Sequence, residues 1–198
     1  MNKISTKDRI LDSALTLFAQ KGYDGVGVDL IAENAGIKGP SLYKHFKGKE
    51  DILDALIDKA EKYYEMNFGS AKHPGKIPSS TQELVKLSLE RIQFTLQDPI
   101  IKKVRRVLAM EQFRSQRIAE LAAKHSMEGI QGMYKKILQG MIDNGVIRKY
   151  DSALLSMELV SPISLLIQIC DREPQREQEI MELIKAHLNH FVAIYAIK

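Results

Sequence analysis

The sequence is poor in the features that mark secreted, fibrous and membrane-spanning chains. It has one cysteine in 198 residues, so no disulfide can form within the chain, which favours a reducing compartment. Six prolines and 12 glycines exclude a collagen-like or low-complexity chain. No uninterrupted apolar run reaches the roughly 18–20 residues that a membrane span needs, and no apolar signal core follows the N-terminus. We therefore expect a cytoplasmic protein without a membrane segment.

One short window of the chain has a local excess of positive charge, although the net charge comes from the residues after 60. Lysine and arginine outnumber acidic residues by 29 to 25, which gives a net charge of +4, but the charges within residues 1–60 cancel. The window 36–49 holds four lysines and no acidic residue, with Tyr43, His45 and Phe46 among them. Interleaved basic and aromatic residues suit a surface that contacts phosphates. The alternative is an ordinary solvated loop, because surface lysine clusters are common.

The pattern of apolar residues is helical throughout, without the alternation typical of strands, so the fold class is predicted to be all-α. A stretch rich in glycine, proline and serine at residues 69–80 is the clearest loop. The apolar spacing predicts three short N-terminal helices and a series of longer ones. Their approximate bounds are 5–21, 28–35, a segment containing Leu42 and Phe46, 49–64, 81–97, 100–113, 118–143, 151–170 and 174–197.

The first three helices have the pattern of a helix-turn-helix unit. Ala35-Gly36 supplies a tight break between the second and third helices, and Ile37 supplies an apolar anchor that turns inward. Leu42 and Phe46 are one helical turn apart and form the buried face of the third helix. The polar residues of the third helix lie on or near its opposite face, where they can contact a partner.

These residues resemble the DNA-binding signature of TetR-type transcriptional regulators. The matching segments are IAENAGI at residues 31–37 and GPSLYKHFKGKEDIL at residues 39–53, and the resemblance extends over about residues 5–57. It implies a helix-turn-helix domain at residues 1–50, with the first part of a linking helix continuing to about residue 68. It also implies a larger helical domain for ligand binding and dimerisation at residues 51–198.

The resemblance assigns roles to the residues of the third helix and its neighbours. It implies phosphate contacts for Tyr43 and Lys49, a position at the DNA backbone for His45, and base contacts first for Ser41 and Lys44. The full DNA-binding set is Lys38, Gly39, Pro40, Ser41, Tyr43, Lys44, His45 and Lys49. The chain departs from the family pattern where a capping hydroxyl precedes the second and third helices, since Gly27 and Lys38 occupy those positions.

The C-terminal part is expected to bind a small-molecule effector and a second copy of the chain. Candidate pocket residues are Phe94, Met110, Phe113, Tyr134, Met141 and Leu166, although methionines in helices are often simple core residues. The last two helices are apolar over more than one face, which must be covered. Candidate dimer-interface residues there are Leu155, Leu159, Leu188, Phe191 and Tyr195. No metal site is expected, because His187 and His190 lack further ligands, and no cofactor is expected.

The predicted function is a dimeric repressor that a small molecule releases from a palindromic double-stranded DNA operator. An activator or an adaptor on the same fold remains an alternative. A helical enzyme is disfavoured, because the sequence has no G-x-S-x-G, no phosphate-binding glycine loop, no H-E-x-x-H and no clustered carboxylates. The basic run from Lys102 to Arg106 is interpreted as a solvated helix face, with an anionic ligand as the alternative.

Overall fold

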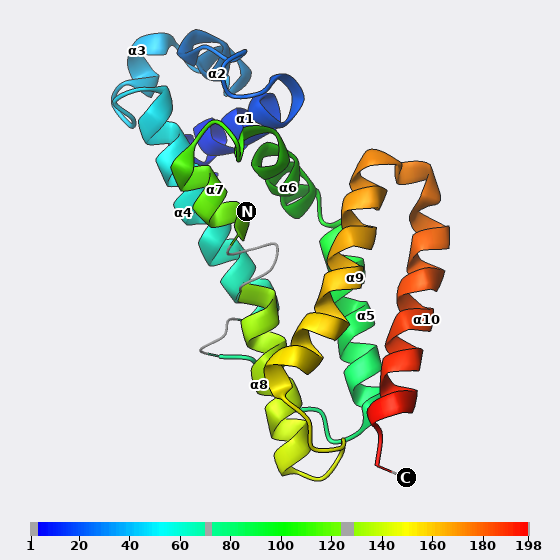
Figure 1. Cartoon of the computed structure of the whole chain (residues 1–198). Coiled ribbons are helices and arrows are strands. Elements are labelled where there is room, and N and C mark those ends of the chain that lie inside the picture. The colour runs from blue at the N-terminus through cyan, green and yellow to red at the C-terminus, as the bar shows by residue number, and fades with distance from the viewer. Residues whose placement is uncertain (1–3, 70–72, 124–128, 198) are drawn as a thin grey trace. The chain divides into compact units, whose positions relative to one another are not determined.

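The computed structural model describes residues 4–69, 73–123 and 129–197, and the regular elements in these ranges are helices (Figure 1). This confirms the all-α class. The helices are α1 (Thr6–Lys21), α2 (Val28–Asn34), α3 (Gly39–Leu42), α4 (Lys49–Phe68), α5 (Thr81–Gln97), α6 (Pro99–Glu111), α7 (Gln116–Ala123), α8 (Gly129–Asp143), α9 (Ser152–Arg172), the 3-10 turn η2 (Pro174–Arg176) and α10 (Glu177–Tyr195).

The chain packs as two compact units that do not follow the order of the sequence. Unit 1 comprises Met1–Tyr64 and Pro99–Ala122, and unit 2 comprises Glu65–Asp98 and Ala123–Lys198. Helices α6 and α7 therefore pack with the N-terminal helices, although residues 65–98 separate them in sequence from the rest of unit 1. The functional boundary near residue 50 stays a prediction, since this division reflects packing alone.

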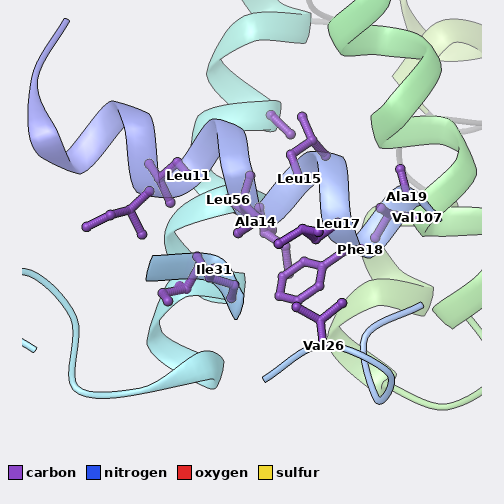
Figure 2. Packing of buried hydrophobic residues seen from close by; sticks show 14 of the residues in the cluster. Leu11, Ala14, Leu15, Leu17, Phe18, Ala19, Val26, Ile31, Leu56 and Val107 are labelled. Carbon is purple, nitrogen blue, oxygen red and sulfur yellow. The ribbon is translucent and has the colours of Figure 1, made fainter. Parts of the chain in front are cut away.

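The core of unit 1 is built around α1, whose apolar residues recur every three or four positions. Figure 2 shows Phe18 and its neighbours from α1, α2, α4 and α6 pointing toward one another. The Ser5 hydroxyl caps α1 by accepting the Asp8 N–H at 3.0 Å, and Gly22, at φ +74°, ends the helix. The predicted helix start and stop are thus confirmed.

Two predicted helices differ from the observed ones. The third helix ends at Leu42 rather than continuing through Phe46. Beyond it the His45 amide donates to the Leu42 carbonyl, three positions back, at 2.9 Å, which is the spacing of a turn. Phe46 is nevertheless buried beside Leu42. The single long helix predicted for 118–143 corresponds to α7 and α8, and residues 124–128 lie outside the described residues.

Unit 2 has α8, α9, α10 and α5 packed around a second apolar core (Figure 1). Asp151 caps α9 by accepting the amides of Ala153 and Leu154. The end of α10 is held by backbone contacts, since the Arg148 N–H donates to the Tyr195 carbonyl at 2.8 Å beside an isolated bridge between Ile147 and Ala196. We call these contacts the C-terminal clasp.

The structure corrects most of the predicted dimer-interface residues. Leu155, Leu159, Leu188 and Phe191 are at most 2% exposed, so they pack inside their own unit and offer no surface to a second chain. Tyr195 is half-buried and donates its hydroxyl to Glu158. The exposed apolar residues lie on the other faces of α9 and α10, and we call them the apolar stripe: Leu154, Met157, Leu165, Leu183 and Ile194.

The same apolar character makes α9 long and apolar enough to cross a membrane by length and composition. Its most apolar 18-residue window has a mean hydropathy of 1.8, and a third of that window is buried inside the structure. The absence of an uninterrupted apolar run in the sequence therefore did not exclude a helix of this length and average composition. Polar interruptions within α9, such as Ser156 and Glu158, had broken the apolar run in the sequence without lowering its average.

Candidate nucleic-acid interface

A glycine turn sets the direction of the segment that follows α2. Gly36 has φ +66°, a conformation that favours glycine. Its amide donates to the Glu33 carbonyl at 2.9 Å, and the Ile37 amide donates to the Ala32 carbonyl at 3.0 Å. Ile37 packs against the core of unit 1, as the sequence predicted. The turn thereby fixes where α3 begins.

Neither α2 nor α3 has a side-chain cap. Gly27 precedes α2 and Lys38 precedes α3, and no side-chain hydrogen bond caps either helix. This agrees with the departures from the family pattern that the sequence contains. The first N–H groups of both helices are therefore not bonded to a capping side chain, and a phosphate oxygen could accept from them.

The predicted DNA-binding residues lie together at the surface of unit 1. We call residues 38–45 the recognition segment. Leu42 and Phe46 anchor it from below and are buried, whereas Tyr43 is 57% exposed. Lys38, Pro40, Tyr43, Lys44 and His45 are exposed, and Gly39, Ser41 and Lys49 are partly exposed. The structure thus leaves every predicted residue accessible, and the DNA contacts themselves stay predictions.

Lys49 has a structural contact that the sequence did not indicate. Its ammonium donates to the Tyr23 carbonyl at 2.9 Å and lies 4.2 Å from the centroid of the Tyr23 ring, a cation–π geometry. Burial, followed by the charge of Glu50, raises the pKa of Tyr23 above its ordinary value, so the ring stays neutral. The Lys49 ammonium has three N–H donors and can contact a phosphate while holding Tyr23.

Glu111 holds the backbone of Tyr23 through its N–H, which lies in the peptide unit before the one that Lys49 contacts. This residue is the last of α6, and its side chain is only 4% exposed. Its Oε1 accepts the Tyr23 N–H at 3.0 Å. A Cβ at Gly22 would lie 3.2 Å from that oxygen, at a backbone φ that disfavours other residues, so glycine allows the close approach. The Tyr23 backbone therefore links the end of α6 to the first residue of α4.

Sequence reasoning missed Glu111 although a signal was present. The buried residues of α6 are Ile101, Val104, Val107, Leu108 and Glu111, so the glutamate continues the buried apolar face of that helix at helical spacing. An acidic residue at such a position needs a partner that satisfies it. The partner lies 88 positions away in sequence, which no local pattern could identify.

Further polar contacts join the helices of unit 1. Lys59 of α4 pairs with Asp8 and Asp12 of α1, each at 3.1 Å. The hydrogen bond from Ser5, then Lys59, lowers the pKa of Asp8. Lys103 of α6 donates to the Thr16 hydroxyl at 2.9 Å. The basic run in α6 is therefore not solely a solvated face, because one of its lysines contacts α1.

The predicted pocket residues are divided between the two units. Tyr134 and Met141 are buried in unit 2, where Phe94 and Leu166 are half-buried. Met110 and Phe113 belong to unit 1. Phe113 is 89% exposed just beyond the end of α6, so it lines no enclosed pocket within unit 1. Phe113 was predicted to be buried because it is aromatic, but α6 ends at Glu111 and its buried face does not extend to residue 113.

His187, considered above as a metal ligand, instead contacts the Leu159 carbonyl at 3.0 Å. Among the described residues, no group of three or more histidine, cysteine, aspartate or glutamate side chains is placed to hold a metal ion.

Comparison with known proteins gives the strongest similarity over the N-terminal helices. The family model of bacterial regulatory proteins of the tetR family matches residues 10–56. The biofilm operon icaADBC negative transcriptional regulator IcaR of Staphylococcus epidermidis is 43% identical over 58 residues, which cover 29% of this chain and 31% of IcaR. The match thus spans only about a third of the length of that relative.

Two further proteins match nearly the whole chain. The probable HTH-type transcriptional regulator YttP of Bacillus subtilis is 24% identical over 98% of this chain and 89% of its own length. The structure of SmeT, the repressor of the Stenotrophomonas maltophilia multidrug efflux pump SmeDEF, has a TM-score of 0.71 at 16% identity and covers 98% of this chain and 92% of SmeT. The similarity to SmeT is a similarity of fold.

Proposed function

The chain belongs to the TetR family of bacterial regulatory proteins, and we propose that it is a dimeric cytoplasmic repressor that a small molecule releases from a palindromic operator. Members of this family are transcription regulators and not enzymes. The observation that carries the proposal is the exposed recognition segment, whose lysines, tyrosine and histidine lie over the buried Leu42 and Phe46. This arrangement presents phosphate and base donors on a rigid support.

The apolar stripe supports the dimer. Leu154, Met157 and Leu165 are exposed along α9, and Leu183 and Ile194 are exposed along α10. A two-fold pairing of these faces would cover them and give a self-complementary interface. Two recognition segments related by this axis would suit half-sites about 34–36 Å apart or somewhat more.

The dimer is tested by placing a charge in the stripe. Leu165→Glu buries a carboxylate in the proposed interface and should convert the dimer to a monomer at micromolar concentration, as measured by light scattering. Met66→Glu is the matched control, because Met66 is 80% exposed on α4 and outside the stripe. A wild-type monomer, or a Leu165→Glu dimer as stable as the wild type, would refute this interface.

DNA binding is tested by fluorescence anisotropy, with an operator selected from the DNA upstream of the gene and from random sequences. Tyr43→Phe should weaken binding to all sequences, because it removes a proposed phosphate contact, whereas Lys44→Ala should relax the preference at one base position. Lys185→Gln, an exposed change on α10, is the control. Binding that is insensitive to both salt and sequence contradicts the proposal.

The effector part of the proposal draws on the similar structures. SmeT has been solved as a complex with triclosan, and another similar structure is that of a flavonoid-responsive regulator. These neighbours favour a small, largely apolar effector here without choosing its chemistry. A reporter gene placed behind the selected operator separates repression from activation, because deletion of the regulator raises expression only under repression.

A further inference from the structure

Arg91 on α5 has a buried nitrogen that remains unsatisfied. Its Nη2 donates to the Pro74 carbonyl at 3.2 Å, and the loop approaches so closely that a Cβ at Gly75 would lie 3.7 Å from the same nitrogen. The other terminal nitrogen, Nη1, is buried and has no hydrogen-bond partner within the described part of the chain. A buried N–H without an acceptor destabilises a fold substantially.

The surroundings of this nitrogen come from α5 and α8, both in unit 2. The guanidinium carbon of Arg91 lies 5.9 Å from the ring centroid of Tyr134. The Tyr134 hydroxyl donates to the Ser88 hydroxyl at 3.0 Å in a buried hydrogen bond. Ser88 is 0% exposed and Tyr134 is 6% exposed. A cation, an aromatic face and a buried hydroxyl pair therefore lie next to the apolar core of unit 2.

Among the described residues, no carboxylate is paired with the charge of Arg91. Buried guanidinium groups are ordinarily paired with an anion. Nη2 is already bonded to the Pro74 carbonyl, and Nη1 carries two N–H donors for a further acceptor. The single positive charge of the guanidinium suits a singly charged group such as a carboxylate.

We propose that Arg91 receives the carboxylate of an amphipathic small molecule, with Ser88 and Tyr134 beside it. The inference rests on the proposed function, since this molecule would be the effector of unit 2. The carboxylate would accept from Arg91 Nη1 and from the Ser88 hydroxyl, which accepts from Tyr134 and keeps its own hydrogen to donate. The apolar part of the molecule would lie against Tyr134 and the neighbouring core residues.

The test compares matched acids and alcohols on the purified full-length chain. Straight-chain carboxylates of 4–16 carbons and primary alcohols of the same lengths serve as probes, because a flexible tail does not require a preformed shape. Calorimetry without DNA should give at least about tenfold tighter binding for the best acid than for its alcohol. Dodecyl phosphate, as a doubly charged probe, should bind more weakly than dodecanoate.

Variants assign the preference to Arg91. Arg91→Gln should weaken binding of the acid about 10–100-fold and leave binding of the alcohol nearly unchanged. Arg91→Lys keeps the charge and should retain part of the preference. Arg172→Gln, at the exposed end of α9, is the matched control and should bind like the wild type. Circular dichroism of each variant establishes that it is folded.

Several results would overturn the proposal. They are an acid and an alcohol that bind the wild type equally, an absence of binding by every acid in the series, and an Arg91→Gln variant that keeps the preference. Tighter binding of dodecyl phosphate would overturn the assignment to a carboxylate. The proposed function fails separately: if the acid binds through Arg91 but does not release the operator, the site stands and the release mechanism is wrong.

Discussion

In unit 1 the buried carboxylate of Glu111 accepts the Tyr23 N–H, whereas in unit 2 the buried Nη1 of Arg91 has no acceptor within the described ranges. Both units have an extended apolar core, so the contrast lies in their polar groups. A polar group that is satisfied inside the chain fixes geometry, as Glu111 and Lys49 do for Tyr23. One that is not satisfied leaves an interaction for another molecule to complete.

This difference suits two separate tasks. The proposed recognition of DNA requires side chains held in a defined position, and in unit 1 contacts between distant helices fix Tyr23 and Lys49. Sensing requires a state that a second molecule stabilises relative to the free one, because a ligand shifts an equilibrium only through its differential affinity. The four predictions below test this contrast in order of expected size.

The largest loss of stability should come from truncating a buried core phenylalanine, and it should be the same in both units. Phe18→Ala in unit 1 and Phe191→Ala in unit 2 remove side chains that are at most 1% exposed and should each reduce the free energy of unfolding by about 3–5 kcal/mol. Urea unfolding followed by circular dichroism measures both. Phe113→Ala, at an exposed position, should change it by less than about 0.5 kcal/mol. If the two substitutions reduce the free energy of unfolding by different amounts, the two units differ in their apolar cores and not only in their buried polar groups.

Removing the satisfied group of unit 1 should destabilise it. Glu111→Ala leaves the Tyr23 N–H without its acceptor and should reduce the free energy of unfolding by about 1–3 kcal/mol. It should also weaken operator binding, because Lys49 donates to the carbonyl of the same residue, Tyr23. Glu111→Gln keeps an acceptor oxygen and should recover part of both losses. If Glu111→Ala changes neither stability nor binding, the link through Tyr23 has no role.

Removing the unsatisfied group of unit 2 should raise the free energy of unfolding slightly or leave it unchanged, unlike the loss expected for Glu111→Ala. Arg91→Met deletes a half-buried charge and its buried, unpaired donor Nη1 while keeping an apolar stem, so the free energy of unfolding should stay the same or rise by up to about 1 kcal/mol. The same urea measurement, without any added ligand, decides the sign. A loss as large as that of Glu111→Ala would show that Arg91 is satisfied in solution, and the contrast would disappear.

The smallest effect concerns acid, and it should again be shared. Hydrogen bonds from Ser79 lower the pKa of Glu83, in unit 2, to about 2, and the hydrogen bond from Ser5 lowers that of Asp8, in unit 1. Because both folded pKa values lie below the unfolded ones, each contribution is complete above about pH 4.5 and is lost as the pH falls toward the folded value.

Glu83→Gln and Asp8→Asn should therefore each flatten the decline of the urea midpoint below pH 4.5. Glu182→Gln, an exposed change on α10, is the control and should leave the decline unchanged. If both substitutions leave the curve as steep as in the wild type, these two carboxylates do not contribute to acid unfolding.

The sequence was most informative where a helix has one apolar face. Leu42 and Phe46 were predicted to be buried and Tyr43 and Lys44 to be exposed, and the structure agrees. Short one-faced helices leave only one way to face the core. Helix α9 is apolar on several faces, so the apolar pattern did not show which face is buried within the chain. Leu155 and Leu159 were therefore predicted to lie in the dimer interface. The structure buries those residues inside the chain instead.

Contacts between distant parts of the chain were beyond local patterns. Glu111 reaches Tyr23 across 88 positions, and α6 joins unit 1 although the preceding helix belongs to unit 2. Arg91 shares this difficulty, since its environment depends on Tyr134 and on the loop at Pro74. Residues such as Glu111 and Arg91, whose partners are distant in sequence, could therefore be identified only from the structure.

The C-terminal clasp has a practical consequence for handling the protein. The Tyr195 carbonyl accepts the Arg148 N–H, the Ile197 N–H donates to the Val146 carbonyl at 3.4 Å, and Ala196 bridges Ile147. Tolerance to truncation follows from the hydrogen bonding of the affected backbone. A chain shortened before residue 195 would release the segment between α8 and α9 as well as the end of α10. Purification tags and fluorescent labels therefore belong at the N-terminus or beyond a spacer that leaves residues 195–197 intact.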